Sequence, residues 1–397
     1  MTKAKEWKRV KDTIKGRRFL SFMKSHFQKI LGLVSIFAQL PILKNLFFSQ
    51  LWINRMSSAM PPQTIKSMID YNNKATIQCK VAANLLKYII EAARHLPPPS
   101  SNHCVRVLEN ACSHGVNSVD FALAVCQAVV DRDPSATVSF IFNDLPDNDF
   151  NKVLALVSNS AVADFNPTLR TLGKNMYSPL TEPGTLDLVY SNASLHWLSS
   201  LSWLAGEGHS PSKAANQARE DFSAYISSRH QELRQGGKLV VSFPGVPDGQ
   251  SGMNSCFPDD FKRAHEVVAE RGAASLTWMQ KYCISPVYSR NRAEVASAFS
   301  DANWTVDVME LQDIEEFGAS DYRAGRITLD DIATRTADML SSIYHSTFIS
   351  MWVQYGGLEK GQAEDLMGVF SEALHQALKE PKTLRVYHLW VIVATKK

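Results

Sequence analysis

The chain has 397 residues, 45% of them hydrophobic and 20% charged, with 19 Gly and 17 Pro, a globular composition that excludes collagen, a coiled coil and wholesale disorder. The net charge of +3 is uneven, because residues 1–55 carry 12 Lys and Arg against 2 Asp and Glu, a charge of +10, which leaves −7 for the rest of the chain. An acidic body argues against a nucleic-acid-binding surface, so we expect no nucleic-acid partner.

Residues 1–55 form a basic and apolar N-terminal extension. Lys and Arg alternate with aromatic and aliphatic residues up to Lys29, and the stretch that follows is mostly apolar but contains Gln39, Pro41 and Lys44. This pattern is neither a clean membrane span nor a secretory signal, and it favours a membrane-surface segment or an organelle presequence. A poorly ordered extension and a later start of translation are the alternatives. We expect a cytoplasmic protein whose contact with a membrane or organelle, where it has one, is made by residues 1–55.

The cysteines and histidines give no sign of a cross-linked or metal-binding protein. No two of the six cysteines form a C-x-x-C pair, and the eleven histidines contain no H-E-x-x-H arrangement. Because no clear secretory signal supplies an oxidising compartment, we expect free and mostly buried thiols. We also expect no zinc or other metal site.

From Cys104 onward, short apolar runs alternate with helical stretches, which is typical of a parallel sheet covered on both faces. At this length we expect two domains or one large α/β domain with a substantial insertion. Strands are predicted at residues 104–109, 136–143, 186–191 and 238–243. Helices are predicted at residues 117–131 and 214–234, the second one ending at Gly236 and Gly237.

Two further alternating runs, residues 304–311 and 384–397, lie far apart in the sequence and are predicted to pair at the closing edge of the same sheet. Residues 244–303 and 312–383 are mainly helical and contain many aromatic and methionine side chains. We predict that these two segments form a helical cap over the ligand-binding edge, although ordinary helix packing would use the same residues. The remaining part, residues 56–243, then contains an N-terminal element and the ligand-binding core.

Polar loops follow three of the predicted strands, and in an open α/β sheet the ligand lies outside the carboxyl ends of the strands. The loop from Glu109 contains a single glycine and no G-x-G-x-x-G, so a nicotinamide reductase loses its main support. Asp144 follows the second strand, where a carboxylate can accept both hydroxyls of a ribose, although it could equally cap the next helix. His196 and Trp197 offer ring nitrogens to a ligand after a later strand, although a lone tryptophan is more often part of the core.

These three loops, in this order, resemble the SABATH family of plant-type carboxyl methyltransferases, which act on salicylate, benzoate, jasmonate and related small acids. Residues 143–151 nearly repeat the family's N-D-L-P-x-N-D-F-N, and residues 194–199 repeat S-L-H-W-L-S. Residues 229–241 resemble the family's R-x-x-E-L-x-x-G-G entry to a strand. Residues 71–78 keep the tyrosine and glutamine of an N-terminal S-Y-x-x-N-S-x-x-Q element. The resemblance runs from about Met60 to the C-terminus.

The resemblance implies an α/β fold of the class I methyltransferase type, a Rossmann-like sheet of seven strands with the last one antiparallel, plus the helical cap. It also implies that S-adenosylmethionine binds over the first two strand ends. The cofactor-binding residues that it implies are Tyr71, Glu109, Asn117, Asp144, Leu145, Asn175 and Met176. Glu109 and Asn117 would face the methionine portion and Asp144 the ribose. Leu145 and Met176 would flank the adenine.

The chain departs from the family's pattern at positions that bear on the cofactor and the acceptor. Glu109, Ala111 and Ala75 stand where the family has Asp, Gly and Ser. Asn175, Met176 and Ala193 replace the usual Ser, Phe and Tyr.

The resemblance assigns Gln78 and Trp197 to the acceptor carboxylate, and their chemistry suits that role. A carboxylic acid is already ionised at neutral pH and needs no general base, and neutral donors orient the anion without a tight ion pair that would quench it. A hydroxyl acceptor would need a base, for which His196 is the candidate, although a structural or positioning role is the alternative for this residue.

We therefore predict an S-adenosylmethionine-dependent O-methyltransferase that converts the carboxylate of a small-molecule acid to a methyl ester. Two alternatives remain open. One is an enzyme that methylates a hydroxyl of a small secondary metabolite, and the other is a non-catalytic S-adenosylmethionine-binding protein. A homodimer is a possible assembly of this chain.

Overall fold

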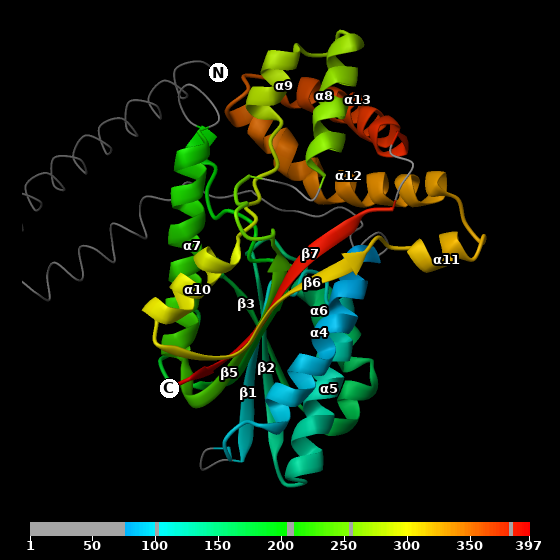
Figure 1. Ribbon diagram of the computed structural model, residues 1–397. Coiled ribbons are helices and arrows are strands. Elements are labelled where there is room, and N and C mark those ends of the chain that lie inside the picture. The colour runs from blue at the N-terminus through cyan, green and yellow to red at the C-terminus, as the bar shows by residue number, and fades with distance from the viewer. Residues whose placement is uncertain (1–75, 100–102, 205–209, 254–256, 381–383) are drawn as a thin grey trace, which may run out of the picture. The chain divides into compact units, whose positions relative to one another are not determined.

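The computed structural model describes residues 76–99, 103–204, 210–253, 257–380 and 384–397, and within them seven strands form one sheet (Figure 1). The strands are β1 (Cys104–Asn110), β2 (Thr137–Asp144), β3 (Thr168–Gly173), β4 (Leu186–Asn192), β5 (Leu233–Pro244), β6 (Trp304–Glu315) and β7 (Val386–Lys396). Their order is β3-β2-β1-β4-β5-β7-β6. The strands from β1 to β5 pair in parallel, whereas β7 is antiparallel to both β5 and β6. The predicted seven-stranded sheet with an antiparallel last strand is confirmed.

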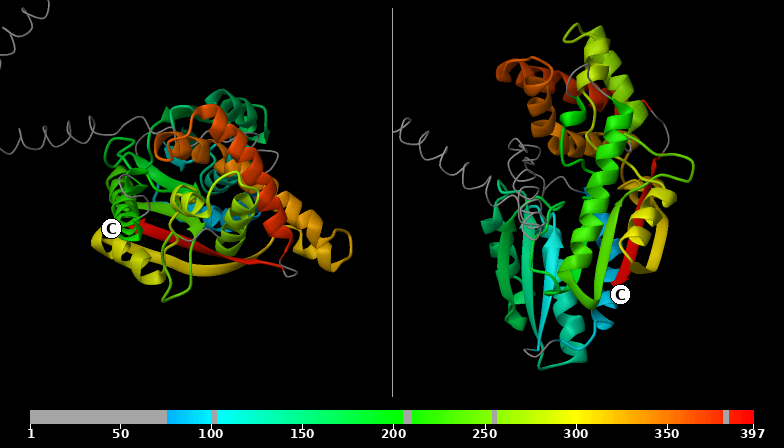
Figure 2. Two further views of the ribbon diagram at one scale, coloured as in Figure 1. Left: turned by 90° about the horizontal axis from the view of Figure 1, so that it is seen from above. Right: turned by 90° about the vertical axis from the view of Figure 1, so that its left-hand side faces the viewer.

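Helices cover both faces of this sheet and extend beyond one end of it. They are α4 (Thr76–Arg94), α5 (Val116–Arg132), α6 (Phe150–Ser158), α7 (Pro211–Glu232), α8 (Pro258–Glu270), α9 (Leu276–Tyr282), α10 (Arg292–Asp301), α11 (Ala319–Arg323), α12 (Leu329–Gln354) and α13 (Lys360–Lys379), with 3₁₀ turns η1 (Ala161–Phe165) and η2 (Ser202–Leu204). α4 and α5 pack on one face of the sheet, and α7 and α10 pack on the other. α8, α9, α12 and α13, which we call the cap helices, lie beyond the carboxyl ends of the parallel strands (Figure 2).

The alternation of side chains along the central strands explains the two layers of core. Val107 lies in the hydrophobic cluster under α4 and α5, and its neighbour Leu108 lies in the cluster under α7 and α10. β4 is covered on both faces, and its first six residues are all buried. β3 has the sequence TLRTLG and no buried residue, because it lies at the edge of the sheet. No apolar run therefore marks this strand in the sequence.

The predicted end of the second helix is wrong, because the chain changes from helix to strand before the glycine pair. α7 ends at Glu232 and β5 begins at Leu233, so Gly236 and Gly237 lie inside the strand. Gly236 has a φ of 76°, and a Cβ atom there would lie 2.6 Å from Cγ of Pro97. This glycine therefore permits the close approach of β5 to Pro97 and does not end a helix.

β6 and β7 are neighbours in the sheet although three helices lie between them in the sequence. β6 ends at Glu315, later than predicted, and Glu315 pairs with the first residue of β7. The next residue, Glu316, is 1% exposed and accepts hydrogen bonds at 3.3 Å from the Thr336 hydroxyl of α12 and from Nη1 of Arg385. Arg385 also forms an ion pair of 2.6 Å with Asp260 of α8. One largely buried ionic cluster therefore ties two cap helices to the sheet.

Within the predicted cap segment 244–303, α10 packs against α7 and β6, whereas α8 and α9 pack with each other. The domain boundaries and the homodimer remain predictions from the sequence. Residues 1–55, with the membrane contact expected of them, lie outside the described residues. In the described part of the chain, no helix combines the length and the apolar character that crossing a membrane requires.

The loop from β1 to α5 contains three residues in the left-handed region of backbone space. Ala111, Ser113 and Gly115 have φ values of 59°, 50° and 86°. Gly115 is also required for space, because a Cβ atom there would lie 2.9 Å from Cα of Val153. Ala111 and Ser113 carry a Cβ atom in this conformation, which costs about 1–2 kcal/mol for each residue. The loop therefore holds strain directly at the end of β1.

We expect Ala111→Gly to raise the free energy of unfolding by about 0.5–1 kcal/mol, because relief of the Cβ penalty outweighs the greater entropy of glycine in the unfolded chain. The matched control is Ala155→Gly at an exposed position of α6, where the same substitution should lower stability by about 1 kcal/mol. Urea unfolding of the two variants measures the two effects. Destabilisation by both would contradict the assignment of strain to position 111.

Candidate active site

A row of buried polar side chains crosses the carboxyl ends of β2, β1 and β4. The strand register places Asn143, Asn110 and Ser191 side by side, and all three are fully buried. Nδ2 of Asn143 donates to Oδ1 of Asn110 at 3.2 Å, and the Ser191 hydroxyl donates to the carbonyl of Asn110 at 3.0 Å. These hydrogen bonds fix the ends of β2, β1 and β4 relative to one another. The loops that follow the three strands therefore begin at fixed positions.

Glu109 lies one residue before the end of β1 and is 4% exposed. Its carboxylate accepts hydrogen bonds from the hydroxyls of Ser118 at 2.9 Å and Tyr190 at 3.1 Å. Both donors are neutral, and burial raises the pKa of Glu109 to about 7. Ser118 follows Asn117 in the first turn of α5. A desolvated carboxylate of this kind is stabilised in its charged form when a cationic group binds beside it.

Asp144 ends β2 and is held by the backbone of two loops. Its Oδ2 accepts the N–H of Ser113 at 2.7 Å, and its Oδ1 accepts the N–H of Leu145 at 2.8 Å. Each carboxylate oxygen keeps a second lone pair that can accept a hydroxyl. Cys112 is buried beside it, and burial, together with the charges of Asp144 and Glu109, raises the pKa of the Cys112 thiol. Among the described residues, no three His, Cys, Asp or Glu side chains are arranged to hold a metal ion.

Residues 175–180, which we call the β3 loop segment, follow β3 and are held by one buried guanidinium. Arg229 of α7 is fully buried and donates to the carbonyl of Met176 at 2.8 Å and to that of Ser178 at 3.0 Å. Glu232 balances its charge through two hydrogen bonds of 2.7 Å. The planar fork of Arg229 thus fixes the two carbonyls on either side of one loop residue.

Residues 194–199, which we call the β4 loop segment, follow β4 and are anchored near both ends. Arg290 is 2% exposed and donates from Nη1 to the carbonyl of Leu195 at 2.7 Å. Asp221 of α7 accepts the N–H of Ser199 at 2.7 Å and also its hydroxyl. Burial lowers the pKa of Arg290 and raises that of Asp221, while the opposite charges of the two side chains counter both shifts.

Trp197 occupies the middle of the β4 loop segment and lies where the sheet edge meets the cap. Its carbonyl accepts a hydrogen bond from the Tyr177 hydroxyl at 2.5 Å. Its ring centroid is 5.7 Å from that of Tyr344 in α12 and 5.6 Å from that of His196. The residue is 7% exposed. The indole therefore lies in a setting from which most water is excluded.

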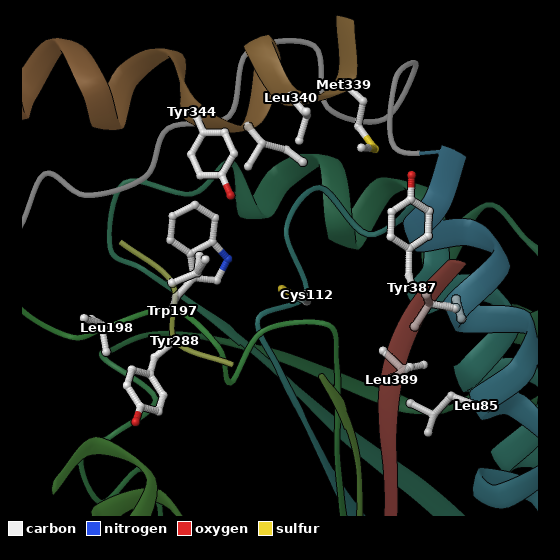
Figure 3. Close-up of a cluster of buried hydrophobic side chains, with 14 of the residues drawn as sticks. Leu85, Cys112, Trp197, Leu198, Tyr288, Met339, Leu340, Tyr344, Tyr387 and Leu389 are labelled. Carbon is white, nitrogen blue, oxygen red and sulfur yellow. The ribbon is translucent and has the colours of Figure 1, made fainter. Parts of the chain in front are cut away.

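The part of α12 that faces Trp197 is apolar and aromatic. Figure 3 shows Tyr344, Leu340 and Met339 along this helix, with the Tyr344 hydroxyl directed toward the indole. The Ser285 hydroxyl donates to the Tyr344 oxygen at 2.6 Å and fixes that ring. These residues belong to the same hydrophobic cluster as the sheet face under α4, so they serve helix packing and also face the candidate site.

The structure places most of the predicted site residues at one edge of the sheet. The cofactor residues found there are Glu109, Asn117, Asp144, Leu145, Asn175 and Met176. His196 and Trp197 follow the adjacent strand β4. Gln78 lies in the first turn of α4, its side chain lies outside the described part, and Tyr71 lies outside the described residues. The binding and catalytic roles of all these residues remain predictions.

Several residues that position the site were not predicted from the sequence. They are Ser118, Tyr177, Tyr190, Asp221, Arg229, Glu232 and Arg290. Arg229 and Glu232 stand three residues apart within the segment that resembles a strand entry, and this pattern could have indicated them. Arg290 bonds to backbone carbonyls, and Asp221 bonds to the backbone and hydroxyl of Ser199 and to Gln217. In a sequence such residues look like ordinary surface charges.

Both the sequence and the fold match known methyltransferases. The family described as SAM dependent carboxyl methyltransferase matches residues 66–396. A probable methyltransferase of Theobroma cacao is 26% identical over 67% of this chain and 84% of its own length. A salicylate/benzoate carboxyl methyltransferase of Arabidopsis thaliana is 29% identical over 36% of this chain and 43% of its own length. The solved structure of loganic acid methyltransferase with SAH has a TM-score of 0.63 at 15% identity, covers 84% of this chain and 99% of its own, and is similar in fold.

The raised pKa of Glu109 predicts a dependence of stability on pH. A carboxyl whose pKa rises from 4.5 to about 7 on folding stabilises the protein fully below its unfolded pKa, and this contribution disappears as the pH rises through about 7. In Glu109→Gln, the side chain at this position is an amide and does not titrate. Relative to this variant, the wild type should therefore lose about 1–3 kcal/mol of its free energy of unfolding between about pH 5 and pH 8.

Urea unfolding at the two pH values tests this expectation. Glu220→Gln, which changes an exposed carboxyl of α7, is the matched control and should follow the wild type. Parallel pH dependence of the wild type and Glu109→Gln would contradict the prediction.

Proposed function

Because the chain belongs to the family of SAM-dependent carboxyl methyltransferases, we propose that it methylates the carboxylate of a small, apolar acid and releases a methyl ester. The proposal rests above all on Trp197. Three side chains from other elements, Tyr177, Arg290 and Asp221, hold the backbone of its loop segment, and its indole adjoins the apolar part of α12. A neutral N–H donor in a setting with little water suits an anionic acceptor.

The residues at the sheet edge suit the chemical groups of S-adenosylmethionine. The buried carboxylate of Glu109, which has only neutral donors in its hydrogen bonds, suits the cationic amino group of the cofactor. Asp144 has lone pairs for the ribose hydroxyls, and the half-buried side chains of Leu145 and Met176 suit the flat adenine. When bound, the cofactor supplies a methyl group on a positively charged sulfur.

The role that we assign to the chain's own residues is to orient the acceptor and to exclude water. Trp197 and Gln78 would donate hydrogen bonds to the acceptor carboxylate, which is ionised at neutral pH and needs no general base. Neutral donors fix the direction of the anion and leave it more nucleophilic than an arginine would. The cap helices remove solvent from the reacting oxygen, which strengthens the alignment and prevents competing reactions with water.

The lining near Trp197 supports an acid with an apolar or aromatic body. Met339, Leu340 and Tyr344 are all buried, and the Tyr344 ring lies beside the indole. The relative that is named for salicylate and benzoate acts on small aromatic acids, which agrees with this lining. We therefore propose an aromatic or similarly apolar carboxylic acid as the acceptor.

A hydroxyl acceptor is the second candidate, and the position of His196 is the observation that favours it. Its ring centroid lies 5.6 Å from that of Trp197, so an imidazole is available near the proposed acceptor position. Such an acceptor must lose a proton, and a histidine is the side chain suited to accept it near neutral pH.

We expect Asp144→Ala to weaken the binding of S-adenosylhomocysteine about thirtyfold to 150-fold, because a carboxylate that accepts two ribose hydroxyls contributes about 2–3 kcal/mol. Titration calorimetry measures the affinity. Asp147→Ala removes an exposed carboxyl from the same loop and should leave the affinity unchanged. An affinity within twofold of the wild type in a folded Asp144→Ala variant would refute the ribose assignment.

The acceptor class is tested with salicylate, benzoate and other apolar acids and the matching phenols, by detecting methyl esters and methyl ethers. If a carboxylate is the acceptor, Trp197→Phe should lower kcat/KM about tenfold to a hundredfold, since it removes the N–H donor and keeps an aromatic ring. His196→Ala should change the rate less than about threefold, and kcat at saturating cofactor should stay nearly constant across neutral pH.

Trp304→Phe is the matched control for the effect of Trp197→Phe on kcat/KM, which it should leave nearly unchanged. Trp304 lies in the cluster on the other face of the sheet, and its indole nitrogen has no hydrogen-bond partner among the described residues. A rate that climbs with pH through the histidine range, together with an inactive His196→Ala variant, would instead establish a hydroxyl acceptor.

A further inference from the structure

Tyr177 connects the two loop segments of the site. It belongs to the β3 loop segment, directly after Met176, which is predicted to lie beside the adenine. Its hydroxyl donates to the carbonyl of Trp197, in the β4 loop segment, at 2.5 Å. The cofactor side of the site and the residue proposed to orient the acceptor are therefore joined through one phenol.

Arg229 and Asn175 bond to the backbone around Tyr177. Arg229 fixes the carbonyls of Met176 and Ser178, the residues on either side of Tyr177. The Tyr177 N–H donates to Oδ1 of Asn175 at 3.0 Å. Its ring meets the ring of Tyr225 edge to face, with centroids 6.4 Å apart and an interplanar angle of 74°. A ligand that contacts Asn175 therefore acts on a side chain that is bonded to the Tyr177 backbone, and through it on the residue that carries the hydroxyl.

Side chains outside the β3 loop segment also bond to the β4 loop segment. Arg290 and Asp221 hold Leu195 and Ser199, which lie on either side of Trp197. With these two flanking residues anchored, the carbonyl of Trp197 between them is the point at which the β3 loop segment acts. The Leu198 N–H belongs to the same peptide group as the Trp197 carbonyl, and it donates to the carbonyl of Pro286 at 3.0 Å. The Tyr177 hydroxyl is the partner on the carbonyl side, so the orientation of the peptide from which the indole projects depends on this hydrogen bond.

We propose that Tyr177 is a positioning residue that couples cofactor binding to the orientation of the Trp197 indole, an inference that rests on the proposed function of Trp197. With the cofactor bound, the side chains of Asn175 and Met176 pack against it, and the Tyr177 hydroxyl holds Trp197 in its acceptor-binding orientation. Because coupling between two binding sites is reciprocal, the acceptor must also strengthen cofactor binding by the same factor. The two ligands therefore bind with positive cooperativity.

The test follows Trp197 itself, by ¹⁹F NMR of protein labelled with 5-fluorotryptophan. The chain has eight tryptophans, and the resonance that disappears in Trp197→Phe identifies this residue. Adding S-adenosylhomocysteine should shift the Trp197 resonance in the wild type. In Tyr177→Phe, which keeps the ring and loses the donor, that shift should be lost while the calorimetric affinity for S-adenosylhomocysteine stays within about threefold.

Tyr88→Phe is the matched control, since its hydroxyl donates to Glu310 at 2.8 Å between α4 and β6. It should retain the shift of the wild type. A kinetic readout accompanies the spectra. At saturating S-adenosylmethionine, Tyr177→Phe should raise KM for the accepted acid about fivefold to tenfold, while the affinity for S-adenosylhomocysteine measured without the acid stays nearly unchanged.

The outcomes separate the coupling from the proposed function. If the wild type binds S-adenosylhomocysteine and the Trp197 resonance does not move, or moves equally in Tyr177→Phe, the coupling is wrong and the proposed function stands. If Tyr177→Phe loses cofactor affinity more than about tenfold, Tyr177 belongs to the cofactor site itself and the positioning role is overturned. Failure of the wild type to bind S-adenosylhomocysteine would overturn both proposals.

Discussion

The common register of the parallel strands at their carboxyl ends is the constraint on which the site depends. Asn143, Asn110 and Ser191 meet there as a buried row, and each satisfies part of its neighbour's hydrogen bonding. Side chains alternate between the two faces of a strand, so a slip of one residue in β1 would put Leu108 or Asn110 in the place of Glu109. The positions of Glu109 at the end of β1 and of Asp144 at the end of β2 therefore follow from the pairing of the strands, before any loop is considered.

Arginines that are fully or largely buried continue this constraint from the strands into the loops and the cap. Arg229 fixes the β3 loop segment, Arg290 fixes the β4 loop segment, and Arg385 joins two cap helices to the sheet. A buried ion pair adds little net stability, because the cost of removing two charges from water offsets their attraction. The contribution of these arginines is therefore geometric, since each holds backbone carbonyls or carboxylates in fixed directions. Glu109 differs from them, because its hydrogen-bond donors are two hydroxyls and its charge remains available to a ligand.

The sequence predicts those parts of the fold that depend on local pattern. Buried strands such as β4 appear as apolar runs, and the polar loops after them indicate the ligand-binding edge. The edge strand β3 escapes prediction because none of its residues is fully buried and only Leu169 and Leu172 are half-buried. The role of Gly236 escapes it as well, because the reason for that glycine is contact with Pro97, a residue far away in the sequence. The resemblance to a family supplies the residues expected to touch the cofactor. It does not supply Tyr177 or Arg290, whose side chains bond to backbone carbonyls and so leave no residue pattern.

The pairing of Glu315 with the first residue of β7 makes residues 316–385 an insertion into what would otherwise be a hairpin. A segment whose two ends meet at one point can change its length and sequence without disturbing the order of the strands around it. This insertion contributes α12, which faces Trp197, whereas the proposed cofactor edge is built from β1, β2 and β3. Its surfaces that contact α8, α9 and the residues around Trp197 must be preserved with it. The helices beside the proposed acceptor position can therefore vary in length and sequence without changing the order of the strands at the proposed cofactor edge.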